Sequence, residues 1–196
     1  STTTLTSDRS TLKAGTGQSA LLTAKVAVDG APATGRVEFL VDGAVVSTAT
    51  LSNGSASYRL AAAATAGSHQ VVAHYLGTDE VGASTSDPVT VATVPIAVTL
   101  TLHAAPTTVR QNGLIPAIFL VTAVPDAVKL PNGTVEIREG ATVIARVRML
   151  AGVVGLATLP RGQSIGVHHY TAVFTPDDPG VFGTATSNPV TVTVTR

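Results

Sequence analysis

The sequence contains no cysteine and no tryptophan, and charged residues make up only 12% of it. Without cysteine, a disulfide framework, a thiolate metal site and a cysteine nucleophile are all excluded. The charged share is about half of the usual 25%, and 12 basic and 12 acidic side chains give a formal net charge of zero. Because a nucleic-acid binder needs a basic face to displace counterions from phosphates, we expect no nucleic-acid partner.

The sequence also lacks a hydrophobic run long enough to cross a membrane. The longest apolar stretch, Leu114–Val124, is interrupted by Pro116 and Thr122, and it is shorter than the ~20 residues that a spanning helix needs. We therefore expect no membrane insertion of this fragment. No signal peptide is visible and the first residue is Ser1, so we interpret the chain as a mature or excised fragment.

What the sequence does contain is a long internal repeat. The matching segments are Leu5…Leu12 with Leu102…Val109, Val26 with Val124, Gly35–Phe39 with Gly133–Ile137, His69–Tyr75 with His168–Phe174, and Ser86–Val91 with Ser187–Val192. Their spacing drifts from 97 to 101 residues, as small loop insertions would make it. A unit of this length can hold its own core, so we predict two tandem domains, residues 1–94 and 95–196.

Within each copy, apolar residues recur with a period of two. In Ala20–Val28 one parity is apolar, while the other carries Thr23 and Lys25, which is typical of a half-buried strand. Asp42-Gly43 and Asn53-Gly54 are strong hairpin-turn pairs. The pattern predicts an all-β protein in which each copy is an antiparallel β-sandwich of about seven strands.

The first copy resembles the bacterial immunoglobulin-like repeats of group 3. The residues that support this resemblance are Thr3–Thr6, Ala14-Gly15, Leu22–Ala24, Gly35–Phe39, Asp42-Gly43, Thr48–Ala56, Ala66–His69, Tyr75–Asp79 and Pro88–Val91. The second copy departs from this pattern, since Phe174–Asp178 replaces the Tyr-x-Gly-Asp corner and Ala151-Gly152 replaces the Asn-Gly turn. The resemblance implies tandem immunoglobulin-like domains of an extracellular bacterial protein and no shared catalytic residues.

No catalytic or cofactor-binding residues are predicted. His69 and His168 occupy the same inward position in both copies, so a structural role is favoured over a catalytic or switching one. The motifs Gly-x-Ser-x-Gly, the Walker loop and His-Glu-x-x-His are missing from the sequence. We therefore expect that the protein is not an enzyme and needs no cofactor.

Two acidic pairs and one aromatic face remain as candidate binding features. Asp79-Glu80 and Asp177-Asp178 lie in the same corner of each copy. They could hold calcium or accept hydrogen bonds from turn amides, and no metal site is assigned.

If the spacing of 98 holds through the second strand, Phe119 and Val121 take the outward parity of Leu21 and Thr23. Together with Phe182 in a nearby loop, they are our candidate partner-binding face. The alternative is a shift of register that buries them. Arg138, Arg146 and Arg148 make the second copy locally basic, which we interpret as a solvated face.

Two functional hypotheses follow. The first is a non-catalytic structural or spacer module of a bacterial cell-surface or secreted multidomain protein, with the neighbouring domains of the same polypeptide as its partners. The alternative is an adhesin or polysaccharide-binding module that uses loops or the apolar face of domain 2 to bind a surface polysaccharide or a host protein. A monomer located outside the cell is expected in both cases.

Overall fold

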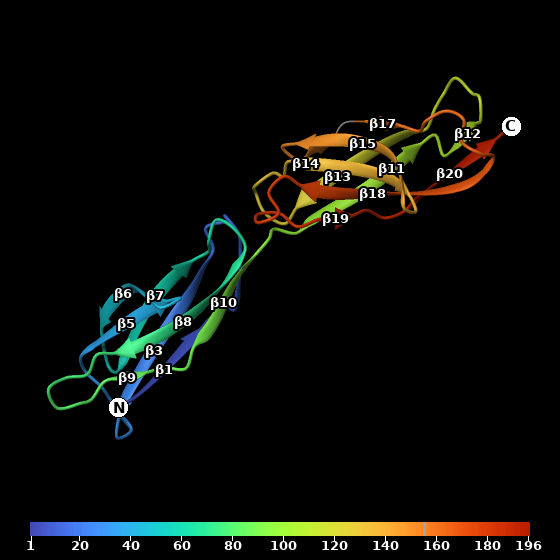
Figure 1. Cartoon of the computed structure of the whole chain (residues 1–196). Coiled ribbons are helices and arrows are strands. Elements are labelled where there is room, and N and C mark those ends of the chain that lie inside the picture. Colours follow the sequence, from blue (N-terminus) through green and yellow to red (C-terminus); the bar gives the residue numbers. More distant parts are fainter. Residues whose placement is uncertain (155) are drawn as a thin grey trace. The chain divides into compact units, whose positions relative to one another are not determined.

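The structure is a computed structural model that describes residues 1–154 and 156–196. Every regular element in this part of the chain is a β-strand, and no helix there is long and apolar enough to cross a membrane. Contacts between Cα atoms divide the chain into two compact units, Ser1–Val94 and Pro95–Arg196. The fold is all-β, as predicted (Figure 1).

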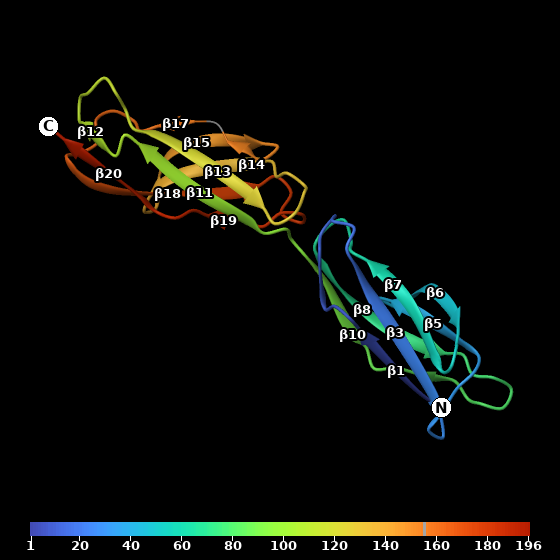
Figure 2. The ribbon, with the colours of Figure 1, turned by 180° about the vertical axis from the view of Figure 1, so that it is seen from behind.

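Unit 1 is a sandwich of two sheets. In the first, β3 lies between β1 and β7 (Figure 2) and also pairs with β4. In the second the order is β2-β10-β8-β5-β6, with β9 beside β8. The strands are β1 Thr2–Ser7, β2 Thr11–Lys13, β3 Ser19–Val28, β4 Ala31–Pro32, β5 Arg36–Val41, β6 Ala44–Thr50, β7 Ser55–Ala61, β8 Gly67–Tyr75, β9 Ser84–Thr85 and β10 Val89–Val94.

The core of unit 1 follows the alternation of the sequence. Along β3 the residues Ala20, Leu22, Ala24 and Val26 are buried, and Lys25 between them is exposed. Successive side chains of a strand point to opposite faces, so one face of β3 enters the sandwich and the other meets solvent.

Unit 2 repeats this plan with one change in its sheets. Its strands are β11 Val98–Ala105, β12 Thr108–Arg110, β13 Ile118–Pro125, β14 Gly133–Glu139, β15 Thr142–Leu150, β16 Val153–Val154, β17 Ala157–Thr158, β18 Gly166–Pro176, β19 Ala185–Thr186 and β20 Val190–Thr195. Two short strands, β16 and β17, pair with β13 where unit 1 has the single strand β7. Because β16 also pairs with β15, the two sheets of unit 2 are joined into one continuous hydrogen-bonded sheet.

A glycine at the start of the third long strand recurs in both units. In unit 1, a Cβ on Gly35 would lie 3.0 Å from the ring of Tyr75, and the φ angle of Gly35 is +110°. In unit 2, a Cβ on Gly133 would collide with the Phe174 ring and the Thr175 carbonyl. The Tyr75 hydroxyl donates to the Thr34 carbonyl at 2.8 Å, a bond that Phe174 has no hydroxyl to make.

The repeat spacing in the first two long strands is 97, not 98, and this corrects two of our expectations. Leu5 pairs with Ala24, and in unit 2 Leu102 pairs with Val121, so Val121 is equivalent to Ala24. The match of Val26 with Val124 is therefore wrong by one residue. The spacing becomes 98 only at the third long strand, where Val37 and Val135 are both buried.

The predicted face of Phe119, Val121 and Phe182 is also wrong, for Phe119 and Val121 because of this shift in spacing. Phe119 is 0% exposed, Val121 3% and Phe182 4%. A shift of one residue moves every side chain of a strand to the other face of the sheet, so Phe119 is equivalent to buried Leu22. Phe182 forms an isolated bridge with Ile96 and joins the same core.

Candidate functional sites

A histidine near the start of β8 in unit 1, and of β18 in unit 2, contacts a carboxylate of the neighbouring hairpin. In unit 1, His69 Nδ1 lies 2.7 Å from Asp42 Oδ2. The second oxygen of Asp42 accepts from the Gln70 amide at 2.9 Å. Both hydrogen bonds lower the pKa of Asp42 below its usual value, and that of His69 has the larger effect. The pair ties the turn after β5 to β8.

In unit 2 the corresponding histidine is more deeply buried and has an acceptor on each side. His168 Nδ1 lies 2.7 Å from Glu139 Oε1, and His168 Nε2 lies 2.9 Å from the Ser164 carbonyl oxygen. A carboxylate and a carbonyl can only accept, so both bonds form when the ring carries two protons. The hydrogen bond to Ser164, followed by that to Glu139, raises the pKa of His168 above 6.5 against the opposing effect of burial.

Tyr170 lies beside this histidine in the core of unit 2. Its ring stacks on His168 with centroids 6.2 Å apart and meets Phe119 edge-on at 5.1 Å. Burial, with a smaller contribution from the charge of Glu139, raises the pKa of Tyr170 to about 12. Its hydroxyl is buried and meets no hydrogen-bond partner among the described residues. The residue equivalent to Tyr170 in unit 1 is Val71, which is also buried.

A serine before the last long strand makes the same three bonds in each unit. The Ser86 hydroxyl accepts from the Ala73 amide at 3.0 Å and donates to the Asp87 carbonyl at 2.9 Å, while the Ser86 amide donates to the Ala73 carbonyl at 2.9 Å. Ser187 makes the equivalent bonds to Ala172 and Asn188, each at 2.8 Å. Both serine hydroxyls therefore form hydrogen bonds with backbone groups of neighbouring residues in the same unit.

Arg138, Arg146 and Arg148 do not form a basic patch, because each of the three is paired with an acid. Glu136 contacts Arg138 and, at 2.8 Å, Arg146, and these hydrogen bonds, with that of Arg138 the larger, lower the pKa of Glu136. Arg148 binds both oxygens of Asp177 at 2.9 and 2.7 Å. This bidentate pair lowers the pKa of Asp177 and raises that of Arg148.

The two acidic corners do not assemble a metal site in the described part of the chain. Asp177 is occupied by Arg148, and Asp178 accepts from the Gly180 amide at 3.2 Å. Asp79 and Glu80 are exposed. Among residues 1–154 and 156–196, no group of three or more His, Cys, Asp or Glu side chains comes together. The turn hydrogen bond expected of Asp178 is present.

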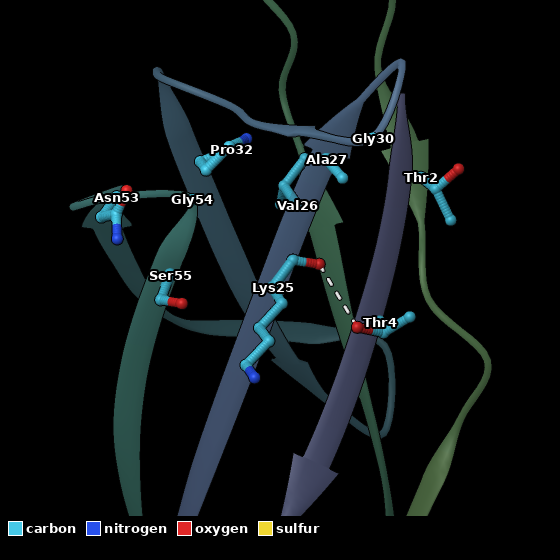
Figure 3. A pocket seen from close by; sticks show the side chains of 10 residues that line it. All are labelled: Thr2, Thr4, Lys25, Val26, Ala27, Gly30, Pro32, Asn53, Gly54 and Ser55. Carbon is cyan, nitrogen blue, oxygen red and sulfur yellow. Dashed lines mark hydrogen bonds between the residues drawn. The ribbon is translucent and has the colours of Figure 1, made fainter.

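A shallow hollow lies on the outer face of the first sheet of unit 1 (Figure 3). Its lining residues are Thr2, Thr4, Lys25, Val26, Ala27, Gly30, Pro32, Asn53, Gly54 and Ser55. The Lys25 side chain extends along β3 away from Gly30 and Pro32 (Figure 3). The Thr4 hydroxyl donates to the Lys25 carbonyl at 3.5 Å, and the Thr2 side chain points away from β3 (Figure 3). The polar groups of this hollow therefore do not converge on one point.

The exposed apolar surface that the sequence analysis missed lies on the other side of β13, opposite Phe119 and Val121. Ile118, Leu120 and Val124 on β13 are exposed, and so are Val153 on β16 and Leu150 at the end of β15. We call these five residues the β13 face. The register Thr122↔Val153 and Leu150↔Val153 places them on one outer surface. A repeat spacing of 97 through this strand would have revealed the face from the sequence.

These features define a class of protein, the immunoglobulin-like β-sandwich. Each unit packs its strands around a core of alternating inward residues. Each also keeps a buried aromatic residue near the end of β8 or β18 (Tyr75, Phe174) and a serine just before its last long strand (Ser86, Ser187). Residues 5–94 match the family "Bacterial Ig-like domain (group 3)". Unit 1 is therefore a bacterial immunoglobulin-like domain of group 3, as its residues indicated.

Solved structures similar to the chain include fibronectin(III)-like modules of Clostridium thermocellum CbhA, at 20% identity and a TM-score of 0.38, covering 97% of this chain and 92% of that one. The Yersinia pseudotuberculosis adhesin InvE matches at 15% identity and a TM-score of 0.46, covering 99% and 59%. Invasin, a bacterial integrin-binding protein, matches at 21% identity and a TM-score of 0.45, covering 99% and 39%. No curated protein matches the chain.

Proposed function

We propose that the chain is a non-catalytic spacer module of a bacterial cell-surface or secreted multidomain protein. The observation that supports this is how the units use the reactive side chains they share. Ser86 and Ser187 bond to backbone, and His69 and His168 bond to their neighbouring hairpins. Residue types that other proteins use for catalysis are here engaged in maintaining the sandwich.

The family of unit 1 supports a bacterial origin, and the resemblance stated above implies an extracellular location. The expected partners are the neighbouring domains of the same polypeptide. The adhesin or polysaccharide-binding alternative has lost the residues on which it first depended, since Phe119, Val121 and Phe182 are buried. Sugar-binding surfaces commonly present aromatic rings, and the rings of Tyr75, Tyr170 and Phe174 are buried as well.

The spacer proposal is tested by co-sedimentation of the purified chain with cellulose, chitin, peptidoglycan sacculi and immobilised host-matrix proteins. The expected result is retention no greater than that of an unrelated β-sandwich of similar charge. Retention on one of these materials would overturn the spacer role. Its loss on Lys25→Ala would then place the site in the hollow of unit 1, and its loss on Leu120→Thr would place it on the β13 face.

A further inference from the structure

Three of the four asparagines precede a glycine, and the structure holds these three Asn-Gly pairs differently. The pairs are Asn53-Gly54, Asn112-Gly113 and Asn132-Gly133, and the fourth asparagine, Asn188, precedes a proline. Asparagine is a thermolabile residue type, and before glycine no side chain keeps the next backbone nitrogen away from the carboxamide. Asn188 lacks this route, because the proline nitrogen carries no hydrogen. The sequence alone therefore offers three equal candidates for loss of the amide group.

Asn53 and Gly54 form the tip of the hairpin between β6 and β7. The turn is closed by the Ser52 amide, which donates to the Ser55 carbonyl at 2.9 Å, and by the Ser55 amide, which donates to the Ser52 carbonyl at 3.0 Å. Asn53 is exposed and lines the hollow of unit 1 (Figure 3). Among residues 1–154 and 156–196, neither the Asn53 carboxamide nor the Gly54 N–H has a hydrogen-bond partner. Both groups that would react are therefore open to water.

The other two pairs are exposed as well, but hydrogen bonds hold the groups that would react. The Gly113 N–H donates to the Arg110 carbonyl at 3.0 Å, so the attacking nitrogen of this pair is engaged. Asn132 Oδ1 accepts from the Ala151 amide at 2.7 Å, which fixes the carboxamide. Gly133 also lies in β14, which is paired on both sides. In these two pairs a hydrogen bond must break before the nitrogen can reach the carboxamide.

We propose that Asn53 is a site of spontaneous deamidation in the folded chain. The Gly54 nitrogen attacks Asn53 Cγ, so that the N–Cγ bond forms, the Cγ–Nδ2 bond breaks, and Nδ2 leaves as ammonia with the proton that the Gly54 nitrogen gives up. Water then opens the cyclic imide at either carbonyl and leaves aspartate or isoaspartate, with nothing oxidised or reduced. The rotation that brings the two groups together is confined to a hairpin tip, where local opening costs little free energy.

The isoaspartate product changes the backbone as well as the charge of this turn. Its main chain runs through the side-chain carbons and is longer by an extra atom, while the Gly54 carbonyl must still accept from the Val26 amide at 2.8 Å. We therefore expect isoaspartate to loosen the hairpin and its contact with β3. The equivalent turn of unit 2 is Ala151-Gly152, which has no carboxamide. The modification goes beyond the spacer role, because it gives unit 1 a slow covalent change that this turn of unit 2 cannot undergo.

Incubation of the whole folded chain at mildly alkaline pH, followed by mass spectrometry of its peptides, tests the proposal. Asn53 should convert to the acid at least about fivefold faster than Asn112 or Asn132, because a hydrogen bond must break first at each of the other two sites. The same chain unfolded in guanidinium chloride should convert all three at similar rates. A folded chain in which Asn53 converts no faster than the other two would overturn the proposal, and so would a preference for Asn53 that persists unchanged in the unfolded chain.

Asn53→Asp and Asn112→Asp are a matched pair of variants, since each replaces one exposed asparagine before a glycine by its own product. Asn53→Asp should remove most of the ammonia that the folded chain releases. Asn112→Asp, which leaves the reactive turn of unit 1 unchanged, should remove little of it. Equal reductions in the two variants would contradict a preferred site at Asn53.

Asn53→Asp also separates the new charge from the longer backbone. Asp29 and Asp42 already have positive φ angles of +49° and +51° in this chain, so aspartate fits the conformation of Asn53 and the variant should unfold like the parent. A parent chain incubated until it carries isoaspartate at this position should show a lower unfolding midpoint in unit 1 alone. An unchanged midpoint of unit 1 in that chain would contradict the expected loosening of the hairpin.

Discussion

The two units keep buried apolar residues at their inward positions and differ in the chemical type of their outward ones. At the inward positions of the second long strand, Leu22 of unit 1 and Phe119 of unit 2 are both fully buried. At the outward positions next to them, Lys25 corresponds to Thr122, and Ser55 corresponds to Val153. Close packing restricts a core position to apolar residues of fitting volume, while an outer position tolerates wide change. The differences in residue chemistry between the two units are therefore concentrated on their outer faces.

The other sheet shows the same divergence with charge instead of apolar surface. In unit 2 the outer positions of β14 and β15 hold Glu136, Arg138 and Arg146, which form an ion-paired cluster. In unit 1 the acid is kept as Glu38, but Leu40 and Thr48 replace the two arginines. Exposed ion pairs contribute little to stability, so this difference also leaves the fold unchanged.

The largest expected effect tests whether Phe119 belongs to the core. Phe119→Ala should lower the free energy of unfolding of unit 2 by about 3–5 kcal/mol, because it removes a fully buried ring and leaves a cavity. Leu120→Ala, a substitution of its exposed neighbour, should change the free energy of unfolding by only about 0.5 kcal/mol. Amide hydrogen exchange, resolved by unit, measures both, and equal losses would contradict the corrected register.

The equivalence of the two serines is tested by Ser86→Ala and Ser187→Ala. Each substitution leaves a buried amide, of Ala73 or Ala172, without its acceptor, which should cost about 1–3 kcal/mol in the unit concerned. Denaturant unfolding, followed by amide hydrogen exchange resolved by residue, should show a similar loss of unfolding free energy in each variant's own unit. A loss confined to one unit would break the structural equivalence.

A smaller gain is expected at the hairpin turn where the units differ by one residue. Asn53 and Ala151 both have a positive φ, at +50° and +49°. This conformation is costly for alanine, and asparagine adopts it more readily. Ala151→Asn should therefore stabilise unit 2 by about 1 kcal/mol, and Asn53→Ala should destabilise unit 1 by a similar amount. Thermal unfolding of the two variants measures the change in unfolding temperature of each unit. Changes of the same sign in the two variants would contradict the prediction.

The smallest effect is a pH dependence confined to unit 2. The pKa of His168 is raised above 6.5 in the folded state. Its contribution to stability is therefore complete below pH 6.5 and is lost as the pH rises through the raised value. The unfolding midpoint of unit 2 should fall over this range, and His168→Gln should remove the dependence. If the variant keeps the slope, another group is responsible.

Much of the fold could be predicted because it depends on local pattern. The period of two in Ala20–Val28 identifies a half-buried strand, and Asn53-Gly54 identifies a turn that needs positive φ. The recurrence of Ser86 as Ser187 predicts two copies of one unit. Each of these signals lies within a few residues of the element it specifies.

The orientation of a strand could not be predicted in the same way. The spacing of 98 holds for Gly35 and Gly133 but not for Leu22 and Phe119, where it is 97. One inserted residue between these strands leaves the sequence pattern of each strand intact and reverses which of its faces is buried. Alternation alone cannot decide this when both parities are apolar, as they are in Ile118–Val121.

The sequence by itself determined an all-β chain with a repeated unit, hairpin turns and no cysteine chemistry. These follow from side-chain types and their period, which are local properties. Only the tertiary structure decided that Phe119 is in the core and Leu120 on the surface. Only it showed that Arg148 is bound to Asp177 and His168 to Glu139. Pairing between distant strands makes these choices, because a side chain is buried or partnered by what lies across the sheet from it.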